Sequence, residues 1–508
     1  MPKIKQKPLT SRILKNTFFN SITRFISGVS GFILTPFLLK FLGLSLFGVW
    51  SFLFVLISYL GLLDLGLAEA TVKFTAEYKA KKDLKVISNL LTLSFIFYLF
   101  LGIILVFSHS LIGFVIKKVL PVPANLPLTI NTFILTAIAF SILNKLSNLL
   151  SSLYVGFQKM ELVTLRQLIY DGLLIFSVLF CIYTKQPVFI IFWIPAFVQG
   201  IAFLFQLFLT KLIFPQFHLN LSLINRSFLK KILKMGSGVQ ASISANVLTT
   251  QITKSLIFVL GSEFLGIYEL AFKAVAFLKA LPTIFLQPLF PAISELDVLD
   301  KAKRNRLISQ GTKYLSFITY PLFFLSFIFM PSLMRLWLGK EIPLAVFAAR
   351  ILLIGFLPDT IVGLFSTALT AVGKVFVNVE YAVLILVLNS LGMYLFLPLE
   401  NFSYLVFVFP LAVFAGFLWK LRRFSQKVLT LNSGFYFKNI VHSGLVCLLA
   451  ATASFLVYKT MFSGLSHILA LIISCFIFGL LYLPLLAITG FFATEDWRLM
   501  KKLFSKKF

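Results

Sequence analysis

Long apolar segments recur at short intervals along the whole of this 508-residue chain. Each runs for roughly 20 residues, which at 1.5 Å of rise per helical residue matches a hydrocarbon core of about 30 Å. Hydrophobic residues make up 59% of the sequence and charged residues only 12%. That leaves too little polar material for the surface of a soluble domain of this length. The sequence therefore predicts an all-α polytopic membrane protein, since backbone exposed to lipid must satisfy its hydrogen bonds within its own segment.

The apolar segments number about fourteen, and we predict a transmembrane helix for each. The first apolar stretch is expected to be a retained span, because it is longer than the apolar region of a signal peptide and no small-residue cleavage site follows it. No loop is long enough for a separate catalytic domain, which needs about 50 residues or more. The predicted spans lie near residues 17–40, 46–70, 87–108, 128–155, 167–184, 188–211, 236–260, 265–292, 310–330, 346–372, 375–397, 403–420, 439–459 and 466–490.

Basic residues outnumber acidic ones by 46 to 17, which gives a net charge of +29. In a soluble protein this excess would suggest a nucleic-acid partner. Here most lysines and arginines fall in every second loop. These loops face the cytoplasm if the N-terminus is cytoplasmic. The positive-inside rule then predicts that both termini are cytoplasmic. Membrane lipids, through their anionic headgroups, are the expected partners of these residues, and no nucleic acid is expected.

A short motif occurs twice, at equivalent places in the predicted span order. One copy is Leu42-Gly43, four residues, then Gly48-Val49-Trp50; the other is Leu260-Gly261, four residues, then Gly266-Ile267-Tyr268. An even number of predicted spans separates the copies, so both point the same way, as in parallel repeats. The sequence therefore predicts two pseudo-symmetric six-helix lobes with Gly43 equivalent to Gly261. The predicted parts are an N-lobe at 1–212, a cytoplasmic linker at 213–235, a C-lobe at 236–422 and a C-terminal helix pair with a basic tail at 423–508.

Five basic residues fall inside predicted spans: Arg24, Lys145, Lys254, Lys273 and Lys279. Each would cost about 2.5–3.5 kcal/mol at the bilayer centre, so we expect them to face water, partners or a ligand. Arg24 and Lys254 lie near a membrane face and could instead extend their charge to it. Lys273 could pair with Glu269, four residues earlier. For Lys145 and Lys279, near mid-span, the main alternative is an ion pair within the helix bundle.

The predicted seventh span also carries a polar stripe at helical spacing, which includes Asn246, Thr250 and Gln251. Small polar residues join helices in membranes, but a stripe that ends in a lysine favours the wall of a water-filled cavity. Among the acidic residues, Asp64 lies at the inner end of a span and Asp359 follows Pro358 deep in another. Each is a candidate for proton or sodium coupling. For Asp359 the role of counter-ion to a lysine is an equal alternative.

Motifs of enzyme chemistry are not apparent. The sequence has no phosphate-binding Gly-Lys-Ser/Thr loop. The four histidines are scattered, and the three cysteines fall in apolar spans without metal-ligand spacing. We therefore expect no catalytic residue, no metal and no cofactor beyond a coupling ion.

The stretch from Gly43 to Lys82 resembles the corresponding part of polysaccharide flippases, the O-antigen type of exporter. The resemblance rests on Phe47-Gly48-Val49-Trp50, on Leu62-Leu63-Asp64-Leu65-Gly66-Leu67 and on the basic loop that follows, and the second copy continues it through Phe290-Pro291-Ala292. It implies membership of the multidrug/oligosaccharidyl-lipid/polysaccharide flippase superfamily, whose members place two six-helix lobes around a central cavity and work by alternating access. It also implies a transporter of the bacterial cytoplasmic membrane and not an enzyme.

For the substrate, the resemblance implies an undecaprenyl-diphosphate-linked oligosaccharide, moved across the membrane for surface polysaccharide biosynthesis. The five intramembrane basic residues would hold the pyrophosphate, and Asn246, Thr250 and Gln251 would contact sugars. A glycan polymerase or glycosyltransferases are further candidate partners. Three alternatives stay open. One is a lipid II flippase, because the extra C-terminal helix pair resembles the additional helices of those proteins. The others are a multidrug/cation antiporter, which the basic interior disfavours, and a membrane glycan polymerase or ligase, which the short loops disfavour.

Overall fold

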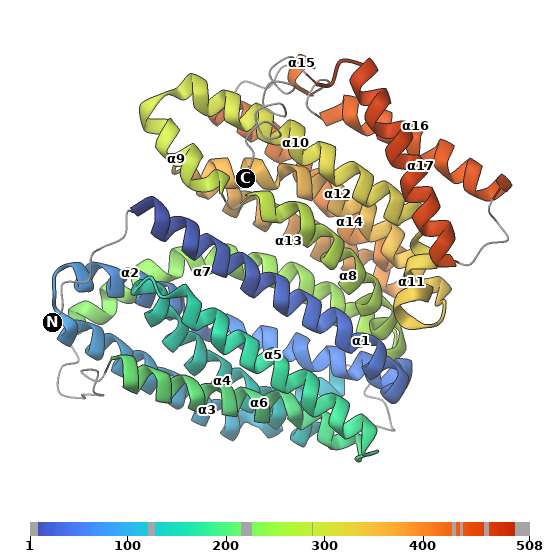
Figure 1. The fold of residues 1–508 in the computed structure, drawn as a ribbon. Coiled ribbons are helices and arrows are strands. Elements are labelled where there is room, and N and C mark those ends of the chain that lie inside the picture. The colour runs from blue at the N-terminus through green and yellow to red at the C-terminus, as the bar shows by residue number, and fades with distance from the viewer. Residues whose placement is uncertain are drawn as a thin grey trace. The chain divides into compact units, whose positions relative to one another are not determined.

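All of the regular secondary structure in the described part of the chain is helical, which confirms the all-α prediction (Figure 1). The computed structural model describes residues 9–119, 128–214, 226–286, 288–428, 433–436, 440–461 and 467–492. Its longer helices are α1 (Leu9–Gly61), α3 (Leu84–Val119), α4 (Ile130–Gly156), α5 (Met160–Tyr183), α6 (Val188–Ile213), α7 (Arg226–Val259), α8 (Ser262–Thr283), α10 (Lys301–Ile328), α12 (Pro343–Ala371), α13 (Phe376–Phe396), α14 (Phe402–Lys427), α16 (His442–Met461) and α17 (His467–Ile488). Its shorter helices are α2 (Leu67–Ala80), α9 (Leu289–Leu299), α11 (Met330–Leu338), α15 (Ser433–Tyr436) and the 3-10 turns η1 (Leu62–Asp64), η3 (Ile284–Leu286) and η4 (Leu397–Leu399).

The chain is a multi-pass membrane protein, as predicted. Ten helices in the described ranges are long and apolar enough to span a membrane, or eleven if α10 and α11, bent by 77° at their junction, form one span. The predicted number of fourteen is not confirmed. One reason is that α7 and α8 carry the polar stripe and several charged residues, so they do not reach the apolar character of the other spans.

The second reason lies in α1. The apolar stretch Phe25–Asp64, which begins within α1 and ends with η1, counts as one span of 40 residues. A straight helix of that length would measure about 60 Å, twice the thickness of the hydrocarbon core. At Gly43 the backbone leaves helical geometry, with φ 72° and ψ 175°, and two helices join there. Glycine tolerates this positive φ, so the sequence correctly placed a break at this residue.

Contacts between helices divide the chain into two compact units, unit 1 (residues 1–270 and 382–405) and unit 2 (residues 271–381 and 406–508). In unit 1, α4 packs against α2, α3 and α6, and α1 packs against α5 and α7. In unit 2, α10 packs against α9, α12 and α16, and α16 packs against α17. The predicted lobes at 1–212 and 236–422, with the linker at 213–235 and the C-terminal part at 423–508, remain predictions.

The two copies of the repeated motif pack against each other within unit 1. A Cβ atom on Gly266 would lie 2.6 Å from the carbonyl oxygen of Leu44, and one on Gly48 would overlap the carbonyl group of Ser262. The hydroxyl groups of Ser45 and Ser262 are hydrogen-bonded at 2.8 Å. Both copies therefore need the second glycine of the motif, Gly48 or Gly266, because α1 and α8 cross there with their backbones in contact.

Candidate functional site

Lys254 forms an ion pair inside unit 1. Its ammonium group on α7 lies 2.7 Å from a carboxylate oxygen of Glu269 on α8, and each side chain is only about a tenth exposed (10% and 11%). Glu269 therefore pairs across two helices with Lys254. Lys273 lies half-buried one turn further along α8, and its pairing stays a prediction. Arg24 lies within α1, and its side chain falls outside the described residues.

The polar stripe of α7 has two faces. Thr249 and Thr253 are buried and meet Asn389 of α13, whose amide donates to the Thr253 hydroxyl at 3.0 Å and to the Thr249 carbonyl at 3.3 Å. This half of the stripe joins helices. Of the predicted sugar contacts, Asn246 is exposed and Thr250 is half-buried. The third, Gln251, has a buried side-chain oxygen without a hydrogen bond among the described residues.

Lys145 belongs to a group that we call the Asp64 cluster: Asp64 at the end of η1, Tyr98 on α3 and Lys145 on α4. Lys145 is 5% exposed and donates a hydrogen bond of 3.1 Å to the carbonyl of Gly61, the last residue of α1. Carbonyl groups at a helix end lack helical partners, which explains why a lysine is held there. The ammonium group also lies 5.8 Å from the centre of the Tyr98 ring, and the Tyr98 hydroxyl donates to Asp64.

Lys279 belongs to a second group, the Asp359 cluster in unit 2: Lys279 on α8, Asp359 on α12, Tyr381 on α13 and Lys420 on α14. Lys279 donates directly to Asp359, and the Tyr381 hydroxyl donates to the other carboxylate oxygen at 2.8 Å. Lys420 lies 3.2 Å from the centre of the Tyr381 ring and donates to the Ser366 hydroxyl at 2.6 Å. The cluster thus holds two lysine side chains and one carboxylate.

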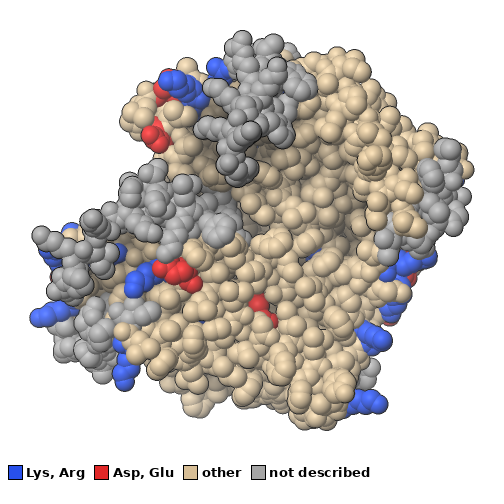
Figure 2. Space-filling view, viewed as in Figure 1, with Lys and Arg blue, Asp and Glu red and all other residues tan. Residues whose placement is uncertain are grey.

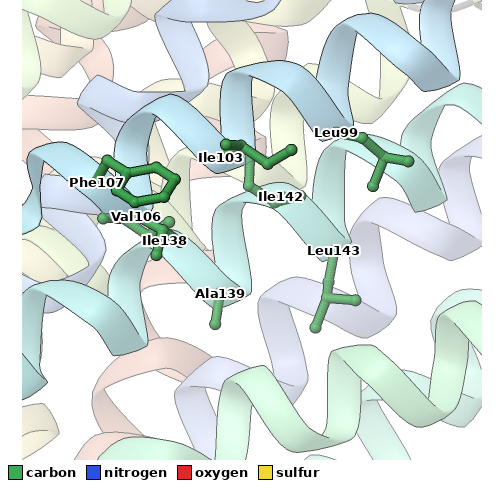
Figure 3. A pocket seen from close by; sticks show the side chains of 9 residues that line it. Leu99, Ile103, Val106, Phe107, Ile138, Ala139, Ile142 and Leu143 are labelled. Carbon is green, nitrogen blue, oxygen red and sulfur yellow. The ribbon is translucent and has the colours of Figure 1, made fainter.

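Each unit also has an apolar groove. One, of about 380 Å³, lies between α3 and α4 in unit 1 and is lined by residues that include Leu99, Ile103 and Ile142 (Figure 3). The other, of about 360 Å³, lies among α10, α12 and α16 in unit 2, where Phe323, Leu353 and other apolar side chains line it. On the face that Figure 2 shows, lysines and arginines gather mostly toward the margins, and a broad area between them carries few charges.

Residues 13–297 match the model of a family described as polysaccharide biosynthesis protein, which spans more than half of the chain. The chain belongs to this family. The resemblance seen in the repeated motif is thereby confirmed, and the first motif copy, the Asp64 cluster and both residues of the Lys254–Glu269 pair fall inside the matched range. No curated protein sequence matches the chain.

Solved structures of transporters share the fold of this family member. The lipid II flippase MurJ, in an inward closed conformation, matches with a TM-score of 0.74 at 15% identity, over 93% of this chain and 98% of that one. An inward-facing multidrug resistance MATE transporter of the MOP superfamily matches with a TM-score of 0.61 at 17% identity, over 80% and 94%. A MOP superfamily transporter from Pyrococcus furiosus, titled for the reverse polarity of its binding pocket, matches with a TM-score of 0.58 at 16% identity, over 83% and 96%. At these identities the likeness concerns the fold alone.

Several polar residues of this family member escaped the sequence prediction. Lys420 is the last residue of the predicted span at 403–420, whereas α14 continues to Lys427. Tyr98 and Tyr381 are two of 15 tyrosines, and nothing in their sequence context marks them. Deep placement in a span was the signal that found Lys145, Lys279 and Asp359. Among the described residues, no three His, Cys, Asp or Glu side chains come together as a metal site.

Proposed function

We propose that this protein is a flippase that moves an undecaprenyl-diphosphate-linked oligosaccharide from the inner to the outer leaflet of the bacterial cytoplasmic membrane, for surface polysaccharide biosynthesis. Both termini would lie in the cytoplasm. The observation that carries the proposal is that two lysines, from α8 and α14, surround the single carboxylate of Asp359 in a polysaccharide biosynthesis family member. Charges placed so deep in a membrane protein are costly and mark substrate paths.

The chemistry of the substrate explains why a basic site is useful. The pyrophosphate and the sugars cannot cross hydrocarbon, whereas the polyprenyl tail can remain in lipid. In this proposal Lys279 and Lys145, with Arg24, Lys254 and Lys273, hold the pyrophosphate, and Asn246, Thr250 and Gln251 contact sugars. Each charge-assisted contact to phosphate contributes about 1.5–3 kcal/mol. The groove among α10, α12 and α16 has the apolar lining that suits part of the tail.

Alternating access requires a contact that opens during transport. The packed motif copies, with Ser45 against Ser262, are our candidate for the outer closure. Cysteines at both positions should form a disulfide, because the two hydroxyl oxygens lie 2.8 Å apart. The cross-linked protein should export no glycan until a reductant is added, with the single Ser45→Cys and Ser262→Cys variants as controls. Full export by the cross-linked protein would show that this contact stays closed throughout transport.

A lipid II flippase is the second candidate function, favoured by the MurJ match over 93% of this chain, against 80% for the MATE transporter. One experiment separates the two. The gene is deleted in its own host, and separately expressed in cells depleted of their lipid II flippase. The leading proposal expects loss of surface polysaccharide on deletion and no rescue of the depleted cells. Rescue of the depleted cells, or an unchanged surface polysaccharide after deletion, would overturn it.

A further inference from the structure

The members of the Asp359 cluster differ in how far they can be reached. The side chains of Lys279 and Asp359 are 26% and 24% exposed, whereas Lys420 is 2% exposed. The Lys279–Asp359 ion pair is therefore the accessible part of the cluster, and Lys420 is its buried part. A ligand that enters this cluster meets Lys279 first.

Asp359 would keep other partners if Lys279 moved away. The Tyr381 hydroxyl donates to it at 2.8 Å, and Lys420, beside the Tyr381 ring, also attracts it. Lys420 is itself held by the Ser366 hydroxyl. The carboxylate is thus fixed and compensated by a group that includes neither Lys279 nor its helix.

Lys279 is held by less. Its partners are the Asp359 carboxylate and the face of the Phe356 ring, 4.5 Å from the ammonium group. In the low dielectric of a helix bundle an ammonium group needs an anion nearby, and in this structure that anion is Asp359. A diphosphate carries more negative charge and more acceptor oxygens than one carboxylate, so it competes for the same ammonium group.

We propose that Lys279 exchanges partners during transport, leaving Asp359 for the diphosphate of the substrate and returning to Asp359 when the substrate departs. This inference rests on the proposed function. Asp359 then acts as a built-in competitor that keeps substrate binding weak enough for release. Tyr381 and Lys420 act as positioning residues, because they hold the carboxylate in place while Lys279 is away.

The exchange predicts opposite effects on binding for two neighbouring substitutions. Binding is measured with undecaprenyl diphosphate and the purified full-length protein in nanodiscs, alongside glycan export in cells. Asp359→Asn should bind the probe about tenfold more tightly and yet export less, because a neutral amide is a weaker competitor for Lys279. Tyr381→Phe should bind it more weakly, because the carboxylate loses a donor and holds Lys279 more strongly.

A merely structural cluster gives a different pattern. In that case Asp359→Asn would lower binding and export together, and this result, or unchanged binding, would overturn the exchange. In a Lys279→Ala background, Asp359→Asn should no longer change affinity, since the group in competition is gone. Glu380→Gln is the matched control, because Glu380 precedes Tyr381 but is exposed and pairs with Arg423 outside the cluster. It should change neither quantity.

Failure of the exchange is distinguishable from failure of the proposed function. If the unaltered protein does not bind undecaprenyl diphosphate, both the proposed function and the exchange are wrong. If the unaltered protein binds the probe but Asp359→Asn does not tighten binding, the exchange alone fails. Should Asp359→Asn not fold, the Tyr381→Phe measurement decides, and tighter or unchanged binding there overturns the exchange.

Discussion

Lys145 and Lys279 are the two lysines that the sequence places near mid-span, and the two units surround them differently. In the Asp64 cluster, Tyr98 binds the aspartate, and the lysine is held by a backbone carbonyl and the tyrosine ring. In the Asp359 cluster, the lysine binds the aspartate directly and shares it with Tyr381. Lys145 is also the more buried, at 5% exposure against 26% for the Lys279 side chain. The same three residue types thus build a fixed lysine in unit 1 and an available one in unit 2.

Lys279→Ala should have the largest effect on export. Loss of one charge-assisted contact to phosphate weakens binding roughly ten- to a hundredfold. The protein should still accumulate, because Asp359 keeps Tyr381 and Lys420 near it. The measurement is surface glycan export normalised to protein level, with the exposed Lys340→Ala as control. Export close to that of the unaltered protein would remove Lys279 from the site.

Lys145→Ala should affect stability more than export. It removes the charge-assisted hydrogen bond to the Gly61 carbonyl, and such a bond contributes about 1.5–3 kcal/mol. It also removes the positive charge beside Tyr98 and Asp64. We expect a lower melting temperature than for Lys279→Ala, measured in the same detergent, with a smaller loss of export per molecule. The reverse order of the two variants in both measurements would break the distinction between a fixed and an available lysine.

The sequence predicted what depends on local pattern. The membrane class and the break at Gly43 follow from apolar length and from one glycine. Depth in a span marked Lys145, Lys279 and Asp359, and a lysine counter-ion for Asp359 was one of two readings. The partners could not be predicted, because Tyr98 and Tyr381 reach the two aspartates from other helices. The predicted number of spans was not confirmed. One reason is that α7 and α8 carry charged and polar residues where the other spans carry apolar ones.

The conservative substitutions should have the smallest effects, and they should still separate the two lysines. Lys279→Arg should keep export within about tenfold of normal, because the charge survives and a guanidinium group also binds phosphate, although its planar fork fits differently. Lys145→Arg should lower the melting temperature, because the larger guanidinium group must fit where Lys145 is only 5% exposed. Both are compared with their alanine variants in the same assays. If Lys279→Arg were as inactive as Lys279→Ala, charge alone would not explain the role of Lys279.

The most direct test of the central claim, that Lys279 binds the substrate and does more than neutralise Asp359, is export by the double variant Lys279→Ala with Asp359→Ala. Removing both charges leaves no stranded carboxylate, so a purely structural pair should be replaceable. Our account predicts a protein that inserts and accumulates normally but exports glycan no better than Lys279→Ala alone. Export restored to the level of the unaltered protein would contradict it and would show that the pair serves only the fold.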